Sequence, residues 1–207
     1  MYSQNKEEDV ILKYFESIGM QAGTFLSIGE NDGETLSNVR ALALKGWCGV
    51  MVEPSPTAFR KLKALYSGSK KGCFYAYELA IGTHNGNAIL HDSGCLLNKG
   101  DTALVSTLVE EEKKRFQSVL TYTPIDVKVF RWKTFLNRLK LKQFDFVSID
   151  AEGFDLAILE QMDLGSLGVR VLCIEWNGNA AMKTAFDKLM SGYNVIYTSA
   201  ENLIYAK

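Results

Sequence analysis

Segments rich in β-branched and aromatic residues alternate along this chain with segments of helical periodicity, and this alternation restricts the fold more than any other feature. Strands are predicted at residues 24–29, 48–53, 73–81, 87–91, 126–131, 144–149 and 169–174. Helices are predicted at residues 6–18, 34–45, 132–141 and 154–162, and one more begins near Pro56, where Ser55 can cap it. Short connections between alternating strands and helices favour a mostly parallel sheet that helices cover on both faces.

The segment 192–207, GYNVIYTSAENLIYAK, departs from this alternation. It is typical of two strands joined by a short Ser-Ala-Glu-Asn turn. Two strands joined by so short a turn must run antiparallel. The sequence therefore predicts a parallel sheet with an antiparallel pair at its C-terminal edge.

Length and charge fix the broad class. The 207 residues suffice for one sizeable core, and the 3 prolines leave no proline-rich linker, so a single domain over residues 1–207 is predicted. The chain carries 23 basic and 24 acidic side chains, a formal net charge of −1. This balance gives no reason to expect nucleic acid as a partner.

The N-terminus and the cysteines indicate a cytoplasmic protein. The first residues, MYSQNKEEDV, carry acids where a signal peptide needs a basic end and an apolar run. No apolar stretch approaches the roughly 20 residues that span a bilayer, so no membrane insertion is expected. Cys48, Cys73, Cys95 and Cys173 form no CxxC pair, which favours buried, reduced thiols over a metal cluster.

A glycine turn follows the first predicted strand. Gly29 and Gly33, in LSIGENDGET, permit a tight turn and the close approach of a ligand to the backbone. The pattern is not GxGxxG, because Asn31 stands where a dinucleotide site has its middle glycine. The surrounding acids would repel a pyrophosphate but favour a ligand with an ammonium and a sulfonium; they are Glu30, Asp32 and Glu34. A tight turn without a ligand explains the pattern equally well.

Glu53 ends the second predicted strand, 20 residues after Gly33. An acid at this separation can accept hydrogen bonds from both ribose hydroxyls of an adenosine. The alternative is a solvated acid at the end of a strand, before Pro54. Together with the glycine turn, Glu53 indicates an adenosine site.

Two carboxylates follow the predicted strand at 144–149. Asp150 and Glu152, in SIDAEGF, would point the same way in extended geometry and would repel each other. Such a pair suits a general base or an acceptor for a substrate hydroxyl, although an acid before a helix can also act as its N-cap. Glu175 and Asn177 could line the same cleft. The only histidines, His84 and His91, make a His-rich metal site improbable, and no metal is predicted, although an all-oxygen Mg²⁺ site stays open.

With these motifs, the chain resembles the FkbM-type branch of the S-adenosylmethionine-dependent methyltransferases, from about residue 24 to the C-terminus. The resemblance is carried by LSIGENDGETLS, MVEPSPTAFRKL, LAIG, SIDAEGFDLAILEQMDL and the closing GY…ENLIYAK. It implies a Rossmann-like class I methyltransferase fold: a seven-stranded, mostly parallel sheet with an antiparallel C-terminal strand and helices on both faces. It also implies O-methylation of a sugar, glycan or natural-product acceptor.

The resemblance assigns roles to individual residues. Gly29, Asn31 and Gly33 would border the methionine part of S-adenosyl-L-methionine, and Glu53 would hold the ribose with Pro54 beside it. Asp150 would contact the cofactor at the methyl-transfer centre, and Glu152 would lie next to it. The remaining cofactor-binding residues would flank the adenine; they are Leu79 and Ala80.

Three positions depart from the family pattern. Ser27 stands where the family usually has an acid, Glu30 replaces a small residue, and Phe154 replaces a residue that is often polar. The loss of the acid at Ser27 keeps open a non-catalytic S-adenosylmethionine-binding module, and Glu30 either compensates for it or crowds the site. The missing glycine argues against a nicotinamide-dependent oxidoreductase, and the absence of an NPPY, DPPY or Pro-Cys segment argues against a nucleic-acid methyltransferase. Residues 92–124 are expected to contain a loop and then a charged helix around EEEKKRF, and to shape the acceptor pocket.

Overall fold

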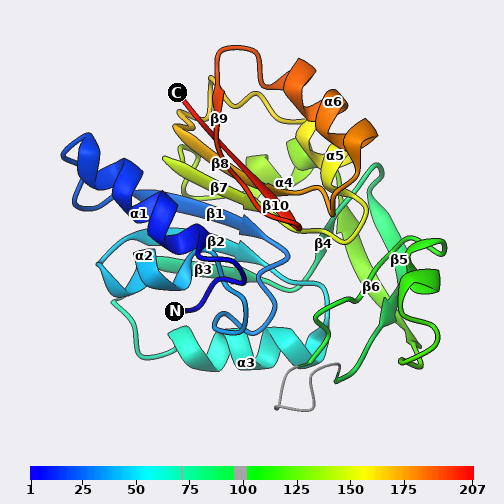
Figure 1. Ribbon diagram of the computed structural model, residues 1–207. Coiled ribbons are helices and arrows are strands. Elements are labelled where there is room, and N and C mark those ends of the chain that lie inside the picture. The colour runs from blue at the N-terminus through cyan, green and yellow to red at the C-terminus, as the bar shows by residue number, and fades with distance from the viewer. Residues whose placement is uncertain (71, 96–101) are drawn as a thin grey trace.

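The computed structural model describes residues 1–70, 72–95 and 102–207. Its main element is a seven-stranded sheet with the strand order β3-β2-β1-β7-β8-β10-β9 (Figure 1). Strands β3, β2, β1, β7 and β8 are parallel, whereas β10 runs antiparallel between β8 and β9. The predicted mostly parallel sheet with an antiparallel C-terminal strand is confirmed. The strands are β1 (Thr24–Ile28), β2 (Cys48–Val52), β3 (Phe74–Tyr77), β7 (Phe146–Ile149), β8 (Val171–Glu175), β9 (Asn194–Thr198) and β10 (Asn202–Ala206).

Helices pack on both faces of this sheet because successive strand residues point to opposite sides. Phe25 of β1 belongs to a core with residues of the first three helices, while Leu26 belongs to a core with residues of the last three. The first group is α1 (Glu7–Ser17), α2 (Arg40–Leu44) and α3 (Pro56–Tyr66), and the second is α4 (Trp132–Arg138), α5 (Asp155–Leu159) and α6 (Ala180–Leu189). None of the described helices is long and apolar enough to cross a bilayer.

The strand predicted at 73–81 is in fact two strands in different sheets. Its first half is β3, which pairs with β2; after Glu78 and Leu79 the chain leaves this sheet. It then forms β4 (Ala80–Ile81) in a three-stranded sheet of order β4-β6-β5, seen beside the main sheet in Figure 1. The other strands of this small sheet are β5 (Gly86–Asp92) and β6 (Thr123–Phe130).

The predicted helix at 34–45 is mostly wrong, since only α2 at its end is helical. Polar side chains before α2 hold the backbone in turns: Asp32 Oδ1 accepts from the N–H of Thr35, and Ser37 Oγ accepts from the N–H groups of Val39 and Arg40. Such local bonds compete with helix formation. By contrast, α6 was not anticipated; Asn179 caps its first turn. The charged segment near residue 112 forms only a short 3₁₀ helix, Glu112–Arg115.

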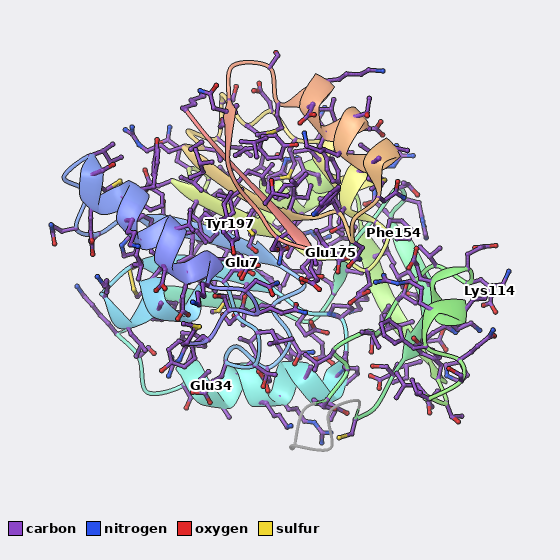
Figure 2. All side chains as sticks on the ribbon, viewed as in Figure 1. Glu7, Glu34, Lys114, Phe154, Glu175 and Tyr197 are labelled. Carbon is purple, nitrogen blue, oxygen red and sulfur yellow. A yellow bond between two sulfur atoms is a disulfide. The ribbon has the colours of Figure 1, made fainter. Side chains whose placement is uncertain are left out.

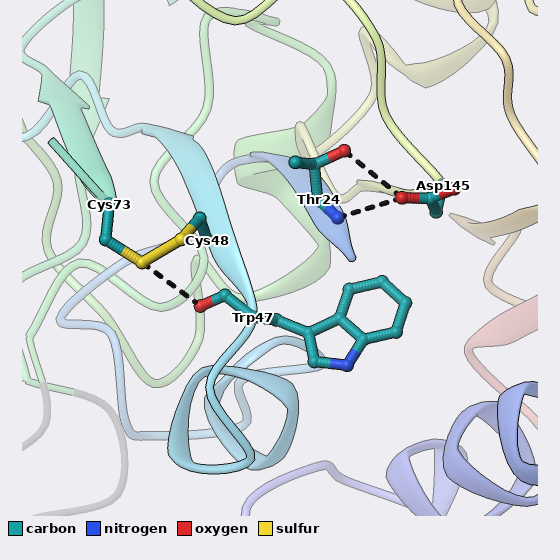
Figure 3. The surroundings of a disulfide bond; sticks show 5 residues. All are labelled: Thr24, Trp47, Cys48, Cys73 and Asp145. Atoms are coloured by element: carbon teal, nitrogen blue, oxygen red, sulfur yellow. Dashed lines mark hydrogen bonds between the residues drawn. A yellow bond between two sulfur atoms is a disulfide. The ribbon is translucent and has the colours of Figure 1, made fainter. Parts of the chain in front are cut away.

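The expectation of reduced cysteines is wrong for two of the four. Cys48, at the start of β2, and Cys73, just before β3, form a disulfide (Figure 3). They are 25 residues apart in sequence and meet because β2 and β3 pair in parallel. Cys173 remains a thiol in the buried strand β8. The argument for a reducing compartment therefore loses the support that it took from the cysteines.

Candidate active site

A cavity of about 390 Å³ lies at the carboxyl ends of the central strands. Each of four strand ends contributes a lining residue: Gly29 after β1, Glu53 after β2, Asp150 after β7 and Glu175 at the end of β8. This is the edge at which open α/β sheets bind their ligands. In Figure 2, Glu175 lies near the centre of the molecule, between the main sheet and the small sheet. The fold thus brings residues far apart in the sequence to one cavity.

The turn after β1 requires glycine at its first position. Gly29 has a φ of +80°, and a Cβ there would lie 1.7 Å from the carbonyl oxygen of Asp150. Its N–H donates to the carbonyl of Val52 at 2.9 Å, so the turn is fixed against both neighbouring strands. Asn31 also has a positive φ, 56°, and its side-chain Nδ2 donates to the carbonyl of Thr102 at 2.7 Å. Gly29 and Asn31 both line the cavity, as their predicted roles require.

Gly33 differs from the other predicted cofactor-binding residues, because it is not among the residues that line the cavity. It has a φ of +84°, and a Cβ there would lie 2.7 Å from Leu62 Cδ1 of α3. Gly33 is therefore needed for the turn and for close packing against α3. Sequence reasoning placed it at the ligand because a GxxxG pattern does not show which side of the turn each glycine faces.

Glu53 is buried, with 5% of its surface exposed. One carboxylate oxygen, Oε2, accepts from the N–H of Asn31 at 2.9 Å, and Oε1 accepts from the N–H of Ser55 at 2.7 Å. Burial nevertheless raises the pKa of Glu53 to about 8. Each oxygen keeps a second lone pair, so the group can still accept hydrogen bonds from a ligand.

The wall beside Glu53 is apolar. Pro54, Leu79 and Ala80 line it, and the last two arrive there because the chain passes from β3 to β4 at this point. Ile81 and Leu90 of the small sheet extend the same surface. A flat apolar wall next to a buried acceptor suits the base and the ribose of a nucleoside.

Asp150, Glu152 and Glu175 bring three carboxylates together, with oxygens within 4.8 Å of one another. The pKa of Asp150 is raised to about 7, mainly by burial and also by the charge of Asp155. Burial also raises the pKa values of Glu152 and Glu175 well above the usual range. Arg115 Nη1 lies 3.8 Å from Glu152 Oε2 and partly offsets this repulsion. Carboxylate oxygens are also the ligands that a hard divalent cation prefers. The expectation that no metal binds here therefore remains a prediction.

The alternative that Asp150 and Glu152 act as N-caps is not supported, because the N-cap residue of α5 is Phe154, and Asp155 instead holds the turn before this helix. Asp155 Oδ1 accepts from the N–H of Ala151 at 2.9 Å, and Oδ2 accepts from the N–H of Gly153 at 3.1 Å. Both are bonds of the turn that leads into α5. The carboxylates of Asp150 and Glu152 are therefore left to face the cavity that they line.

A segment of residues 102–116 lines the cavity beside these carboxylates. Thr107 Oγ1 donates to the carbonyl of Glu152 at 2.7 Å, which fastens the segment to the turn after β7. As expected for residues 92–124, this part shapes the pocket; residues 96–101 lie outside the described residues. Neither histidine lines the cavity, and His91 Nε2 lies 3.0 Å from Glu110 Oε2 instead. The segment contributes Ala103, Leu104, Val105, Ser106, Leu108, Arg115 and Phe116 to the lining.

Two features of the cavity were beyond sequence reasoning. Arg115 is one, since a charged helical pattern, EEEKKRF, does not show that its segment packs beside the strand ends. The burial of Glu30 is the other; only 3% of its surface is exposed, and it accepts hydrogen bonds from Ser27 and Ser37. A smaller cavity of about 240 Å³ shares Arg115 and Glu175 with the first.

Comparison with known proteins fits this geometry. The family described as "Methyltransferase FkbM domain" matches residues 27–194. None of the curated proteins compared with the chain matches its sequence significantly. Among solved structures, monomeric WbdD is 11% identical, with a TM-score of 0.52; the match covers 98% of this chain and 41% of WbdD. The METTL16 MTase domain is 12% identical, with a TM-score of 0.51, over 95% of this chain and 66% of that one.

The two solved structures share the fold at low identity, and the family match spans most of the chain, including the turn after β1 and the carboxylates after β7. The strand order, the antiparallel β10 and the helices on both faces are those of a class I methyltransferase. This protein belongs to the methyltransferase FkbM domain family.

Proposed function

We propose that the protein binds S-adenosyl-L-methionine and transfers its methyl group to a hydroxyl oxygen of a small-molecule or glycan acceptor. The observation that carries this proposal is the meeting of Glu53 and Asp150 in one cavity, each at the end of a parallel strand. Membership of a methyltransferase family supports the reaction class. The resemblance to FkbM-type enzymes supports oxygen as the methyl acceptor.

The lining supports a cationic ligand. Among the described residues, it holds six acidic side chains and a single basic one, Arg115. A sulfonium ligand with an ammonium would stabilise the ionised forms of these acids, whereas the phosphates of a dinucleotide would oppose their ionisation. This is the argument against a nicotinamide cofactor. The acidic residues are Glu30, Glu53, Asp150, Glu152, Glu175 and Glu201.

Different residues are assigned to the ribose, the adenine and the methionine part of the ligand. Glu53 accepts from the ribose hydroxyls, while Pro54, Leu79 and Ala80 enclose the adenine. Gly29 and Asn31 border the methionine part, because they form the turn after β1. The sulfonium would then point toward the carboxylates after β7.

When bound, S-adenosylmethionine supplies a methyl group on a positively charged sulfur, so that attack by oxygen forms a C–O bond as the C–S bond breaks and leaves a neutral thioether. Asp150 receives the proton of the acceptor hydroxyl, which is a poor nucleophile until it loses that proton. A pKa of about 7 keeps a substantial fraction of Asp150 ionised at neutral pH, and makes it a stronger base than an ordinary aspartate. Glu152 lies next to it, and the charge of Asp150 adds to burial in raising the pKa of Glu152.

The acidic lining also supports an acceptor without phosphate groups, and therefore disfavours nucleic acid. The cytoplasmic location stays a prediction from the sequence. A non-catalytic binding module is the second candidate, kept open by Ser27; it would bind S-adenosylmethionine without turnover.

Asp150→Asn tests the proposed base. This near-isosteric change should reduce methyl transfer by about 100-fold or more, because general-base contributions are of this order. Affinity for S-adenosylhomocysteine should change by less than about threefold, since Asp150 is assigned to the acceptor side. The measurement is transfer of a labelled methyl group from S-adenosylmethionine to a panel of hydroxyl acceptors, with calorimetry of the product.

Glu160→Gln is the matched control, because Glu160 is an exposed carboxylate at the end of α5. It should transfer methyl groups at the wild-type rate. Equal activity of Asp150→Asn and the wild type would remove Asp150 as the base. Binding without transfer to any acceptor would favour the non-catalytic module.

A further inference from the structure

The end of the cavity beside β1 is a polar cluster formed by residues from three segments. Ser27 of β1 and Ser148 of β7 are register partners, and both line the cavity. Asn38 Nδ2 donates to Ser148 Oγ at 3.3 Å, which brings the turn before α2 to the same place. Glu30 and Ser37 complete the cluster.

Glu30 is the charged centre of this cluster. Ser27 Oγ donates to Glu30 Oε2 at 2.6 Å, and Ser37 Oγ donates to Oε1 at 2.6 Å. Both donors are neutral, and Glu30 forms no ion pair with any described residue. Burial raises its pKa to about 7; the charge of Asp32 also raises it, and that of Arg40 opposes this only weakly. A buried carboxylate without a cationic partner is costly, and a bound cation would offset that cost.

Asn38 gives a second, independent sign of a missing donor. Its Oδ1 is buried and has no hydrogen-bond partner in the part of the chain that the structure describes. Buried acceptors are nearly always paired in folded proteins. Asn38 lines the cavity together with Glu30, so an N–H donor bound there could serve both side chains.

We infer that Glu30 and Asn38 bind the ammonium group of the ligand, and that Glu30 supplies the acid that position 27 lacks in this chain. This inference rests on the proposed function, because it assumes an S-adenosylmethionine site. An ammonium offers three N–H donors and one positive charge. Glu30 provides the charge and Asn38 Oδ1 provides a neutral acceptor. Ser27 Oγ lies 2.6 Å from Glu30 Oε2. The carboxylate of an aspartate at position 27 would therefore lie close to the place that the carboxylate of Glu30 occupies in this chain.

The test compares three ligands by calorimetry: S-adenosylhomocysteine, decarboxylated S-adenosylmethionine, which keeps the amine, and 5′-methylthioadenosine, which has neither amine nor carboxylate. In Glu30→Gln, affinity for the first two should fall about tenfold or more, because a charge-assisted bond is lost. Affinity for 5′-methylthioadenosine should stay within about twofold. The double variant Ser27→Asp/Glu30→Ala should recover much of the lost affinity for the amine ligands.

Glu34→Gln is the matched control, since Glu34 lies in the same turn but is exposed and outside the lining (Figure 2). It should bind all three ligands like the wild type. An equal change for all three ligands in Glu30→Gln would show that Glu30 only supports the turn, and no change would show that it does not bind the amine. A loss confined to S-adenosylhomocysteine would assign Glu30 to the carboxylate end, which overturns the inference. Failure of the wild type to bind any of the three would instead overturn the proposed function itself.

Discussion

Gly29 shows how a single residue determines the shape of the site. Its α-carbon lies against the backbone of Asp150, so the turn after β1 and the turn after β7 touch where the ligand is proposed to bind. No side chain fits in this contact. The carboxylate of Asp150 is therefore held at a fixed place relative to the glycine turn.

Gly29→Ala should destabilise the protein more than the same change at Gly46. Both glycines have a positive φ, +80° and +90°, so both alanines incur the left-handed backbone cost of about 1 kcal/mol. Gly46 has nothing within 4 Å of the added Cβ, whereas Gly29 would meet the carbonyl oxygen of Asp150. Urea unfolding should give a loss at least about 2 kcal/mol larger for Gly29→Ala. Equal losses would mean that the close approach of the two turns is wrong.

The residues that sequence reasoning found are those whose role follows from a strand end. Glu53 and Asp150 each follow an apolar strand, and parallel strands end at the same edge, so their proximity could be predicted. The packing of Gly33 on Leu62 and the burial of Glu30 could not, because both depend on side chains from other segments.

At the scale of elements, the division of residues 73–81 between two sheets decides what forms the adenine wall. β3 pairs with β2, but Ala80 pairs with Val129 of β6, so the chain crosses the cavity at Leu79. A continuous apolar run does not reveal such a change of partner. The strands at 87–91 and 126–131 were predicted, but their pairing in a separate sheet was not, since pairing is set by distant segments.

Besides their backbone hydrogen bonds, β2 and β3 are linked by the disulfide, which lies at the end of the strands opposite the cavity. It closes a separation of 25 residues, and such a crosslink typically contributes about 3 kcal/mol. Cys48→Ser/Cys73→Ser should lower the free energy of unfolding by about 2–4 kcal/mol while leaving S-adenosylhomocysteine affinity within about threefold. Urea unfolding with and without reductant provides the check.

The wild-type protein with reductant should match the double variant without it. If reductant changes nothing in the wild type, and the double variant is as stable as the wild type, the crosslink is absent in solution.

At the scale of the whole molecule, the cavity concentrates buried acids whose pKa values are raised. Burial raises the pKa of Glu30 and of Asp150 to about 7, and that of Glu53 to about 8, from ordinary values near 4. Between about pH 4 and pH 8, the folded protein therefore binds more protons than the unfolded chain. Stability is therefore greatest below the unfolded pKa values, and falls as pH rises from about 4 through 7 to 8.

The free energy of unfolding of the ligand-free protein should thus be lower at about pH 8 than at about pH 5.5, by at least about 1 kcal/mol. Glu53→Gln should reduce this difference, because glutamine stays neutral at both values. Urea titrations at the two pH values measure it. A stability that rises with pH over this range would mean that these carboxylates are ionised at little cost in the folded protein.

The central claim is that the ends of β1 and β2 hold one nucleoside, with its methyl group facing Asp150. The most direct measurement is calorimetric titration of S-adenosylhomocysteine into the wild-type protein and into Glu53→Gln. The account predicts saturable one-to-one binding to the wild type, and an affinity loss of more than about 1 kcal/mol in the variant, because ribose hydroxyls that donate to Glu53 favour its ionised form, and glutamine cannot ionise. No binding to folded wild-type protein, or equal binding to the variant, would contradict it.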